Sequence, residues 1–187
     1  MSFYILISGI PGCGKSTLGK SLSTALGLPM LDKDDILEAM FDSLGVGEAD
    51  WRHRLSRSAD EELQRMVKRI DKAIITSWWR HPELTGESGT PIEWLSSPEG
   101  IIVEVHCICD PRVAAKRFSG RSRHQGHLDE TRGREDLVPK FEQLALLGPL
   151  GMGNIVYAET SGQVNMHKLL LEIQHHLKGR LELEEYS

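Results

Sequence analysis

The sequence lacks an apolar run long enough to cross a membrane. Its hydrophobic stretches fall short of the roughly 18 residues that a membrane-spanning helix needs, and Met1 to Leu6 lack the basic start and cleavage site of a secretory signal. We therefore expect a cytoplasmic protein that has no membrane partner.

Cysteine is also scarce. The 187 residues include three cysteines, and Cys107 and Cys109 lie two apart in an apolar run, so on a strand they would share a face. An odd number in this arrangement argues against a disulfide framework. His106, Cys107, His124 and His127 show none of the paired spacings of a zinc site, so we expect no zinc there.

The chain has no excess of basic charge. With 22 Lys and Arg against 27 Asp and Glu, its net charge is −5, and no extended basic stripe is present. This balance argues against binding of long nucleic acid. The length and the 40% hydrophobic content fit a single domain over residues 1–187 with one buried core. No feature of the sequence specifies an oligomeric state.

Short apolar runs alternate with segments of helical periodicity. The runs predict strands at residues 3–7, 29–32, 72–78, 101–109 and 154–158, and the periodic segments predict helices at 16–26, 35–44, 59–70, from about 111, 138–145 and 166–177. Residues 81–100 hold three prolines and three glycines and are expected to form an irregular insertion. The alternation predicts an α/β fold with a parallel sheet.

An unbroken phosphate-loop motif follows the first strand. Residues 9–17 match G-x-x-x-x-G-K-[ST] between an apolar strand and an amphipathic helix, which argues against the alternative of a glycine-rich turn with Lys15 in solvent. The glycines let backbone N–H groups point at phosphate oxygens. Lys15 can reach the β and γ phosphates, and the Ser16 hydroxyl can bind Mg²⁺. The motif predicts nucleotide binding through Gly9, Gly12, Cys13, Gly14, Lys15, Ser16 and Thr17.

Three carboxylates follow the second strand, where parallel sheets place their ligands. Asp34 is the residue that we expect to bind an acceptor hydroxyl and take its proton as a general base. The alternative is that Asp34 or Asp35 caps the helix that follows. We assign no functional role to Asp32 at this stage.

Basic residues gather in one part of this acidic chain. Arg117 and Arg121 lie four apart, so a helix would place them on one face, and glycines at 120 and 126 would allow the segment to close. We expect a lid over about residues 112–134 in which Arg117 and Arg121 neutralise the γ-phosphate and Arg123 binds the acceptor. The alternative is a solvated basic helix flank that pairs with nearby acidic residues.

A further arginine follows the third strand. Trp78, Trp79 and Arg80 come at the strand edge where the phosphate loop is also expected. Arg80 is a candidate for binding an anionic group of the acceptor, and the tryptophans are candidates for the pocket wall. The alternative is that at least one tryptophan belongs to the core.

The order of these features resembles the small-molecule branch of the P-loop kinases, which includes chloramphenicol phosphotransferase, gluconate kinase, shikimate kinase and the zeta-toxin-like kinases. The matching parts are residues 9–17, residues 33–36, the basic residues from 117 to 123, and residues 159–162. The resemblance implies a P-loop NTPase three-layer sandwich with a five-stranded parallel sheet in the order 2-3-1-4-5. It also implies ATP as donor, Asp34 as the catalytic carboxylate and Thr160 in a loop beside the adenine.

One departure concerns magnesium. Many relatives end the third strand with an acidic residue that supports Mg²⁺, whereas this chain has Ser77 or Trp78 there. Either Asp34 serves in both roles, or Mg²⁺ rests on Ser16 and the phosphates.

The expected function is transfer of the γ-phosphoryl group from ATP to a hydroxyl of a small molecule. One alternative is a regulatory ATPase or nucleotide-binding switch, although a lid that excludes water serves transfer better than hydrolysis. The other is a kinase for a nucleotide or for the 5′-hydroxyl of a polynucleotide.

Overall fold

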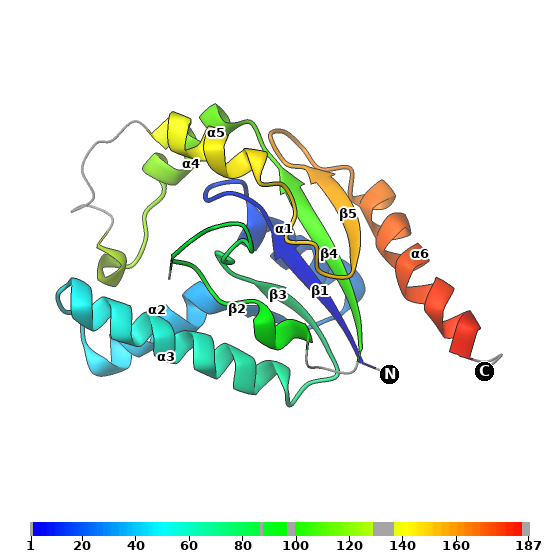
Figure 1. Cartoon of the computed structure of the whole chain (residues 1–187), viewed down its shortest axis with the longest axis horizontal. Coiled ribbons are helices and arrows are strands. Elements are labelled where there is room, and N and C mark those ends of the chain that lie inside the picture. The colour runs from blue at the N-terminus through cyan, green and yellow to red at the C-terminus, as the bar shows by residue number, and fades with distance from the viewer. Residues whose placement is uncertain (1, 87, 97–99, 129–136, 185–187) are drawn as a thin grey trace.

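The computed structural model describes residues 2–86, 88–96, 100–128 and 137–184, with side chains described up to residue 177. Five parallel strands form one sheet in the order β2-β3-β1-β4-β5, with helices on both faces (Figure 1). The strands are β1 (Phe3–Ser8), β2 (Met30–Asp32), β3 (Lys72–Thr76), β4 (Ile101–Ile108) and β5 (Asn154–Glu159). The predicted fold class and strand order are confirmed.

The register aligns the carboxyl ends of the strands at one edge of the sheet. Ile7 of β1 lies opposite Thr76 on one side and Val105 on the other, and Asp32 lies opposite Thr76. The central strand is buried on both faces, which explains its continuous apolar run. The segments that follow β1, β2 and β3 therefore meet at this edge.

Helices cover the two faces unequally. They are α1 (Lys15–Leu26), α2 (Lys33–Leu44), α3 (Ala49–Val67), α4 (Pro111–Gly120), α5 (Leu137–Leu146) and α6 (Met166–Glu184). One core cluster joins one sheet face to α1, α4, α5 and α6, and a second joins the other face to α3. Figure 1 shows α2 and α3 packed side by side below the sheet. None of the described helices is both long and apolar enough to span a membrane.

The α3 helix begins at Ala49, well before the predicted start near residue 59. Its first half packs Trp51 and Leu55 against Leu37 and Phe41 of α2, in a small cluster separate from the sheet. Few positions in this half of α3 are apolar, because they pack only against α2. The helical repeat of apolar residues was therefore too weak to predict this part of the helix.

The predicted insertion at 81–100 packs onto the sheet. Thr90 N donates to Trp78 O and Arg80 N donates to Thr90 O, both at 2.8 Å, which ties the segment to the end of β3. A 3₁₀ turn, η1 (Glu93–Ser96), buries Leu95 beside Trp79. Positions 87 and 97–99 lie outside the described residues.

Candidate active site

The phosphate loop follows β1 and requires its glycines. Gly9, Gly12 and Gly14 have φ values of +131°, +79° and +98°, which side chains rarely adopt. A Cβ at Gly9 would also lie 2.8 Å from the carbonyl oxygen of Cys107, and one at Gly12 would collide with that of Ala114. The loop therefore has both the backbone conformation and the close packing predicted for it.

Lys15 and the start of α1 complete the loop. The Lys15 Nζ donates hydrogen bonds to the carbonyl oxygens of Gly9 (2.9 Å) and Ile10 (3.0 Å), which hold the ammonium over the loop. Helix α1 begins at Lys15 without a side-chain cap, so its first N–H groups are available to an anion. The arrangement suits an anionic ligand such as a phosphate chain.

Asp32 holds the hydroxyl that was predicted to bind Mg²⁺. Ser16 Oγ donates to Asp32 Oδ2 at 2.7 Å, while Asp32 Oδ1 accepts from Asp34 N at 2.9 Å and so caps α2. The helix cap is thus Asp32, and neither Asp34 nor Asp35, and Asp32 also has a role beyond capping. Burial raises the pKa of Asp32 to about 6.

These two oxygens fit a magnesium site. A hydroxyl and a carboxylate are the hard oxygen ligands that Mg²⁺ prefers, and Mg²⁺ would relieve the burial of the Asp32 charge. Ser77 shares a 2.5 Å hydrogen bond with Thr90 instead. Asp32, at the end of β2, is therefore the carboxylate best placed to compensate for the missing acidic residue after β3.

The predicted base, Asp34, pairs with Arg123. Arg123 Nη2 donates to Asp34 Oδ2, and the Asp34 side chain is 47% exposed. Two further pairs join the same segments, His127 with Glu38 (2.8 Å) and His124 with Asp42 (3.3 Å). We call these three pairs the α2 contact. It places residues 123–127 along one face of α2, because its acidic partners are spaced four apart.

The other predicted lid arginines point elsewhere. Arg117 on α4 donates to the carbonyl oxygens of Thr160 (2.7 Å) and Ser161 (2.8 Å), so it joins the loop after β5 that contains Thr160. Arg121 lies just beyond α4 with extended backbone, and its guanidinium packs 4.2 Å from the centre of the Phe118 ring. The helical spacing that predicted a shared face for Arg117 and Arg121 ends before Arg121.

The lid prediction covers segments of different kinds. Residues 111–120 form α4, whose Ala114 and Ala115 are buried in the core. Residues 121–128 include the α2 contact, and 129–134 lie outside the described residues.

Arg80, the arginine predicted to bind the acceptor after β3, contacts its own segment. Its Nη2 donates to Gly89 O at 3.4 Å. The functional roles predicted for Arg80, Arg117, Arg121 and Arg123 stay predictions.

Cys13 lies buried inside the phosphate loop next to Cys107 of β4. A hydrogen bond from the Cys107 thiol lowers the pKa of Cys13, and the Lys15 charge adds to this effect against the opposing influence of burial. The Lys15 Nζ lies 3.9 Å from Cys13 Sγ. The lowered pKa of Cys13 thus depends on Cys107, a neighbour far away in the sequence.

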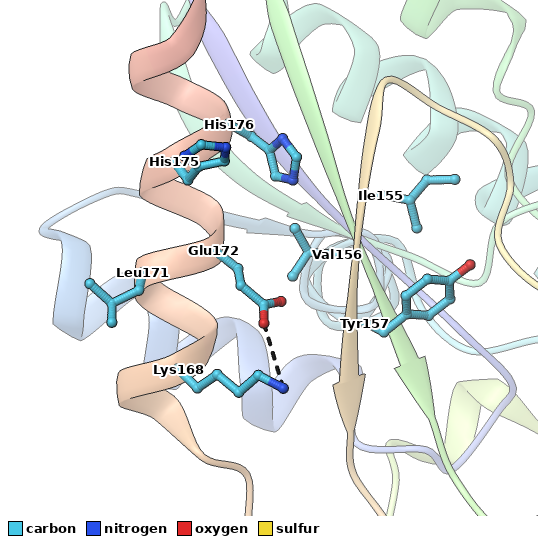
Figure 2. A pocket seen from close by; sticks show the side chains of 8 residues that line it. All are labelled: Ile155, Val156, Tyr157, Lys168, Leu171, Glu172, His175 and His176. Atoms are coloured by element: carbon cyan, nitrogen blue, oxygen red, sulfur yellow. Dashed lines mark ion pairs between the residues drawn. The ribbon is translucent and has the colours of Figure 1, made fainter.

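Two cavities differ in their relation to this site. A narrow pocket of about 40 Å³ borders the phosphate loop at Gly9, Ile10 and Pro11. Its wall includes Trp78, Trp79, His81, Leu84, His106, Leu144, Leu147, Gly148 and Leu150. A groove of about 480 Å³ lies between β5 and α6, with His175 and His176 along one side (Figure 2). The groove includes no phosphate-loop residue, so of these two cavities the narrow pocket is the one that borders the phosphate loop.

Glu104 is a buried carboxyl group that the sequence analysis missed. It lies on β4 with 0% exposure and accepts hydrogen bonds from the backbone N–H groups of Leu150 (2.7 Å) and Met152 (2.9 Å). These bonds hold the wall of the narrow pocket against the sheet. A glutamate inside an apolar strand was the available signal.

Comparison with known proteins places the chain in a family. Residues 5–137 match the family model described as an AAA domain. A search of curated proteins gave no significant match.

Solved structures share the fold. The chain is 24% identical to a "putative kinase" of Chloroflexus aurantiacus, with a TM-score of 0.76 over 94% of this chain and 98% of that one. It is 22% identical to the shikimate kinase of Bacteroides thetaiotaomicron (TM-score 0.54; 96% and 98% covered). It is 16% identical to a gluconokinase of Sinorhizobium meliloti (TM-score 0.50; 98% and 95% covered). At these identities the likeness concerns the fold.

Proposed function

The chain belongs to the AAA-domain family, and from this we propose that it is an ATP-dependent kinase that phosphorylates a hydroxyl group of a small molecule. The observation that carries the proposal is the meeting of three features at one sheet edge: the phosphate loop, the Ser16–Asp32 oxygen pair and the carboxylate of Asp34. The kinase names among the structural neighbours support it.

Each feature has a part in the proposed transfer. The phosphates bind to the loop N–H groups, Lys15 and the start of α1. The loop at Thr160, which Arg117 holds in place, borders the adenine ring of the nucleotide. Ser16 and Asp32 would hold Mg²⁺, which would supply positive charge to the phosphates. Arg123 gives up its bond to Asp34 when the acceptor enters and then binds the acceptor. Asp34 orients the acceptor hydroxyl and takes its proton.

The test is ADP release by the purified protein with ATP and magnesium. It is measured alone and then with pools of sugars, nucleosides, hydroxy acids and aminoglycoside or phenicol antibiotics. We expect slow release alone and faster release with one pool. Fast hydrolysis that no pool changes would indicate a regulatory ATPase and overturn the proposal.

Asp34→Asn tests the assignment of the base. With the stimulating pool, we expect turnover to fall roughly 10²- to 10⁴-fold, because the amide cannot take a proton, while ATP affinity stays unchanged. Asp35→Asn, the same change at the exposed neighbouring position, is the matched control. Equal activity in Asp34→Asn and Asp35→Asn would remove Asp34 from the mechanism.

A further inference from the structure

A chain of polar side chains runs from the core of the sheet to the narrow pocket. Ser8 Oγ donates a hydrogen bond to the buried Glu104 (2.5 Å), which also accepts from two backbone N–H groups. Nδ1 of His106 lies 2.8 Å from the same hydroxyl. Ser8 therefore stands between a carboxyl group and an imidazole.

The single hydrogen of Ser8 decides the tautomer of His106. Because Glu104 already accepts from two backbone N–H groups and acts as an acceptor 2.5 Å from Ser8 Oγ, the Ser8 hydrogen goes to Glu104. A bond between Ser8 and His106 is then donated by Nδ1–H of the imidazole to Ser8 Oγ. A neutral imidazole with its hydrogen on Nδ1 has a free lone pair on Nε2, which is therefore a hydrogen-bond acceptor.

The surroundings of His106 keep the imidazole neutral. Burial lowers its pKa most, and the charge of Lys15 lowers it further, against Glu104, which raises it. From β5, Tyr157 packs edge-on against the ring at 6.1 Å. At pH 7 the accepting lone pair on Nε2 is thus preserved.

His106 is the histidine of the pocket wall that has an accepting nitrogen to spare. Both ring nitrogens of His81 have backbone partners, since Nδ1 accepts from Glu83 N (3.2 Å) and Nε2 lies 3.1 Å from Pro149 O. For His106, the described residues provide a hydrogen-bond partner for Nδ1 and none for Nε2.

The size and position of the pocket restrict what His106 meets. About 40 Å³ is room for a few water-sized groups. The pocket borders Gly9 and Ile10, whose carbonyl oxygens hold the Lys15 ammonium, the group expected to meet the γ-phosphate. Two exposed apolar side chains, Trp78 and Leu84, also line the pocket. A small polar group therefore fits inside, with an apolar body resting outside.

We propose that His106 binds the phosphoryl acceptor, with Nε2 accepting a hydrogen bond from a second hydroxyl of a diol, beside the hydroxyl that is phosphorylated, while the apolar flank of the diol lies on Trp78 and Leu84. This inference rests on the proposed kinase function and narrows the acceptor to a diol with an apolar flank. His106 orients this diol beside the γ-phosphate through one hydroxyl, and Asp34 remains the base for the other.

The tautomer can be tested without any ligand. In a long-range ¹H–¹⁵N NMR spectrum of the full chain at pH 7.5, we expect His106 to be neutral with its proton on Nδ1. Its signals are assigned by their loss in His106→Asn. A proton on Nε2 would overturn the proposal, because that nitrogen would then be a donor.

Binding is tested by ADP release with two probe acceptors, 1-phenyl-1,2-ethanediol and gluconate. We expect 1-phenyl-1,2-ethanediol to stimulate the wild-type protein. His106→Asn keeps a donor for Ser8 but loses Nε2, so the KM for this diol should rise roughly 5- to 100-fold at unchanged ATP affinity. His106→Gln, whose amide oxygen can replace Nε2, should recover part of this loss. The control is His53→Gln, at an exposed position of α3, which should match the wild type.

The pH dependence separates binding from a purely structural role. Below pH 6.5 the KM of the wild type should rise, because a protonated imidazole cannot accept, and His106→Gln should lack this rise. An unchanged KM in His106→Asn, or stimulation by gluconate alone, would overturn the role of His106 and leave the kinase function standing. A wild-type protein that no acceptor stimulates would instead contradict the kinase function itself.

Discussion

Asp32 serves two neighbours with its two carboxyl oxygens. One oxygen caps α2 through Asp34 N, and the other accepts from the Ser16 hydroxyl. The carboxyl group is nearly inaccessible to water, with 6% exposure, so its negative charge is poorly solvated without a cation. The site therefore carries an electrostatic cost in the free protein that bound Mg²⁺ would relieve.

Replacement of Asp32 by Asn should stabilise the free protein near neutral pH. Burial raises the pKa of Asp32 to about 6, so between pH 4 and 6 the folded state keeps a proton that the unfolded state has lost. Stability contributed by this group therefore falls as pH rises through that window. Asparagine does not ionise and is also a favoured helix cap. We expect Asp32→Asn to raise the free energy of unfolding at pH 7.5 by about 1–3 kcal/mol.

Urea unfolding without nucleotide, at pH 4.5 and pH 7.5, measures this effect. The difference between Asp32→Asn and the wild type should shrink at the lower pH, where the wild-type carboxyl is protonated in the folded state. The same variant should need more magnesium for ATP turnover. A variant less stable than the wild type at pH 7.5 would show that the buried charge is already compensated.

Residue patterns that are local in sequence were predictable, and pairs between distant segments were not. The phosphate loop is contiguous, so Gly9 to Thr17 could be assigned from the sequence. Arg123 and Asp34 are 89 positions apart, and the sequence alone could not show that they form a pair. The i, i+4, i+8 spacing of Asp34, Glu38 and Asp42 was visible, but the segment that would pair with this acidic stripe was not.

At the scale of elements, the α2 contact joins a short 3₁₀ turn, η2 (Gln125–His127), to a helix of the acceptor side. Besides its three side-chain pairs, the α2 contact includes Phe41 of α2, which stacks on the His124 ring at 5.3 Å and meets the His127 ring edge-on at 5.7 Å. Gly126 lies against the Phe41 ring, so there is no space for a side chain at position 126. This packing, more than the polar pairs with the partly exposed carboxylates, should determine whether the segment stays on α2.

Substitution of Gly126 by Ala should therefore separate η2 from α2. A Cβ at this position would overlap the Phe41 ring, and such overpacking typically costs about 1–3 kcal/mol. We expect faster amide hydrogen exchange in residues 123–128 and in α2. Gly120→Ala is the matched control, because a Cβ there meets nothing within 4 Å. Equal exchange in the two variants would mean that the packing on Phe41 does not hold the segment.

For the whole molecule, the sheet order followed from the resemblance, while the layers around it were partly hidden. The apolar runs located each strand to within a few residues, because buried strands need continuous hydrophobicity. The early start of α3 and the packing of the 81–100 segment were missed, because their apolar residues contact α2 and the sheet rather than repeating a period. The acceptor site was hidden from the sequence for the same reason. The residues proposed for it, Asp34, Arg80, His106 and Arg123, lie on four segments that are far apart in the sequence.

The phosphate loop couples the stability of the whole chain to nucleotide binding. A ligand that binds the folded state at 100 times its dissociation constant stabilises it by about 2.7 kcal/mol, which for a domain of this size raises Tm by about 5–10 °C. We expect this shift with ATP and magnesium and a smaller one with ATP and a chelator, because Ser16 and Asp32 then lack the cation that joins them to the phosphates.

Lys15→Met should abolish most of that shift. The free protein should stay folded, because the Lys15 side chain is partly exposed and its hydrogen bonds are to carbonyl oxygens of the loop. The matched control is Lys20→Met, the same change at an exposed position on α1, which should keep the full shift. Thermal unfolding of the three proteins, each with and without ATP and magnesium, measures the effect. An equal shift in Lys15→Met and the wild type would place the nucleotide away from the loop, and the Ser16–Asp32 pair would then need another explanation.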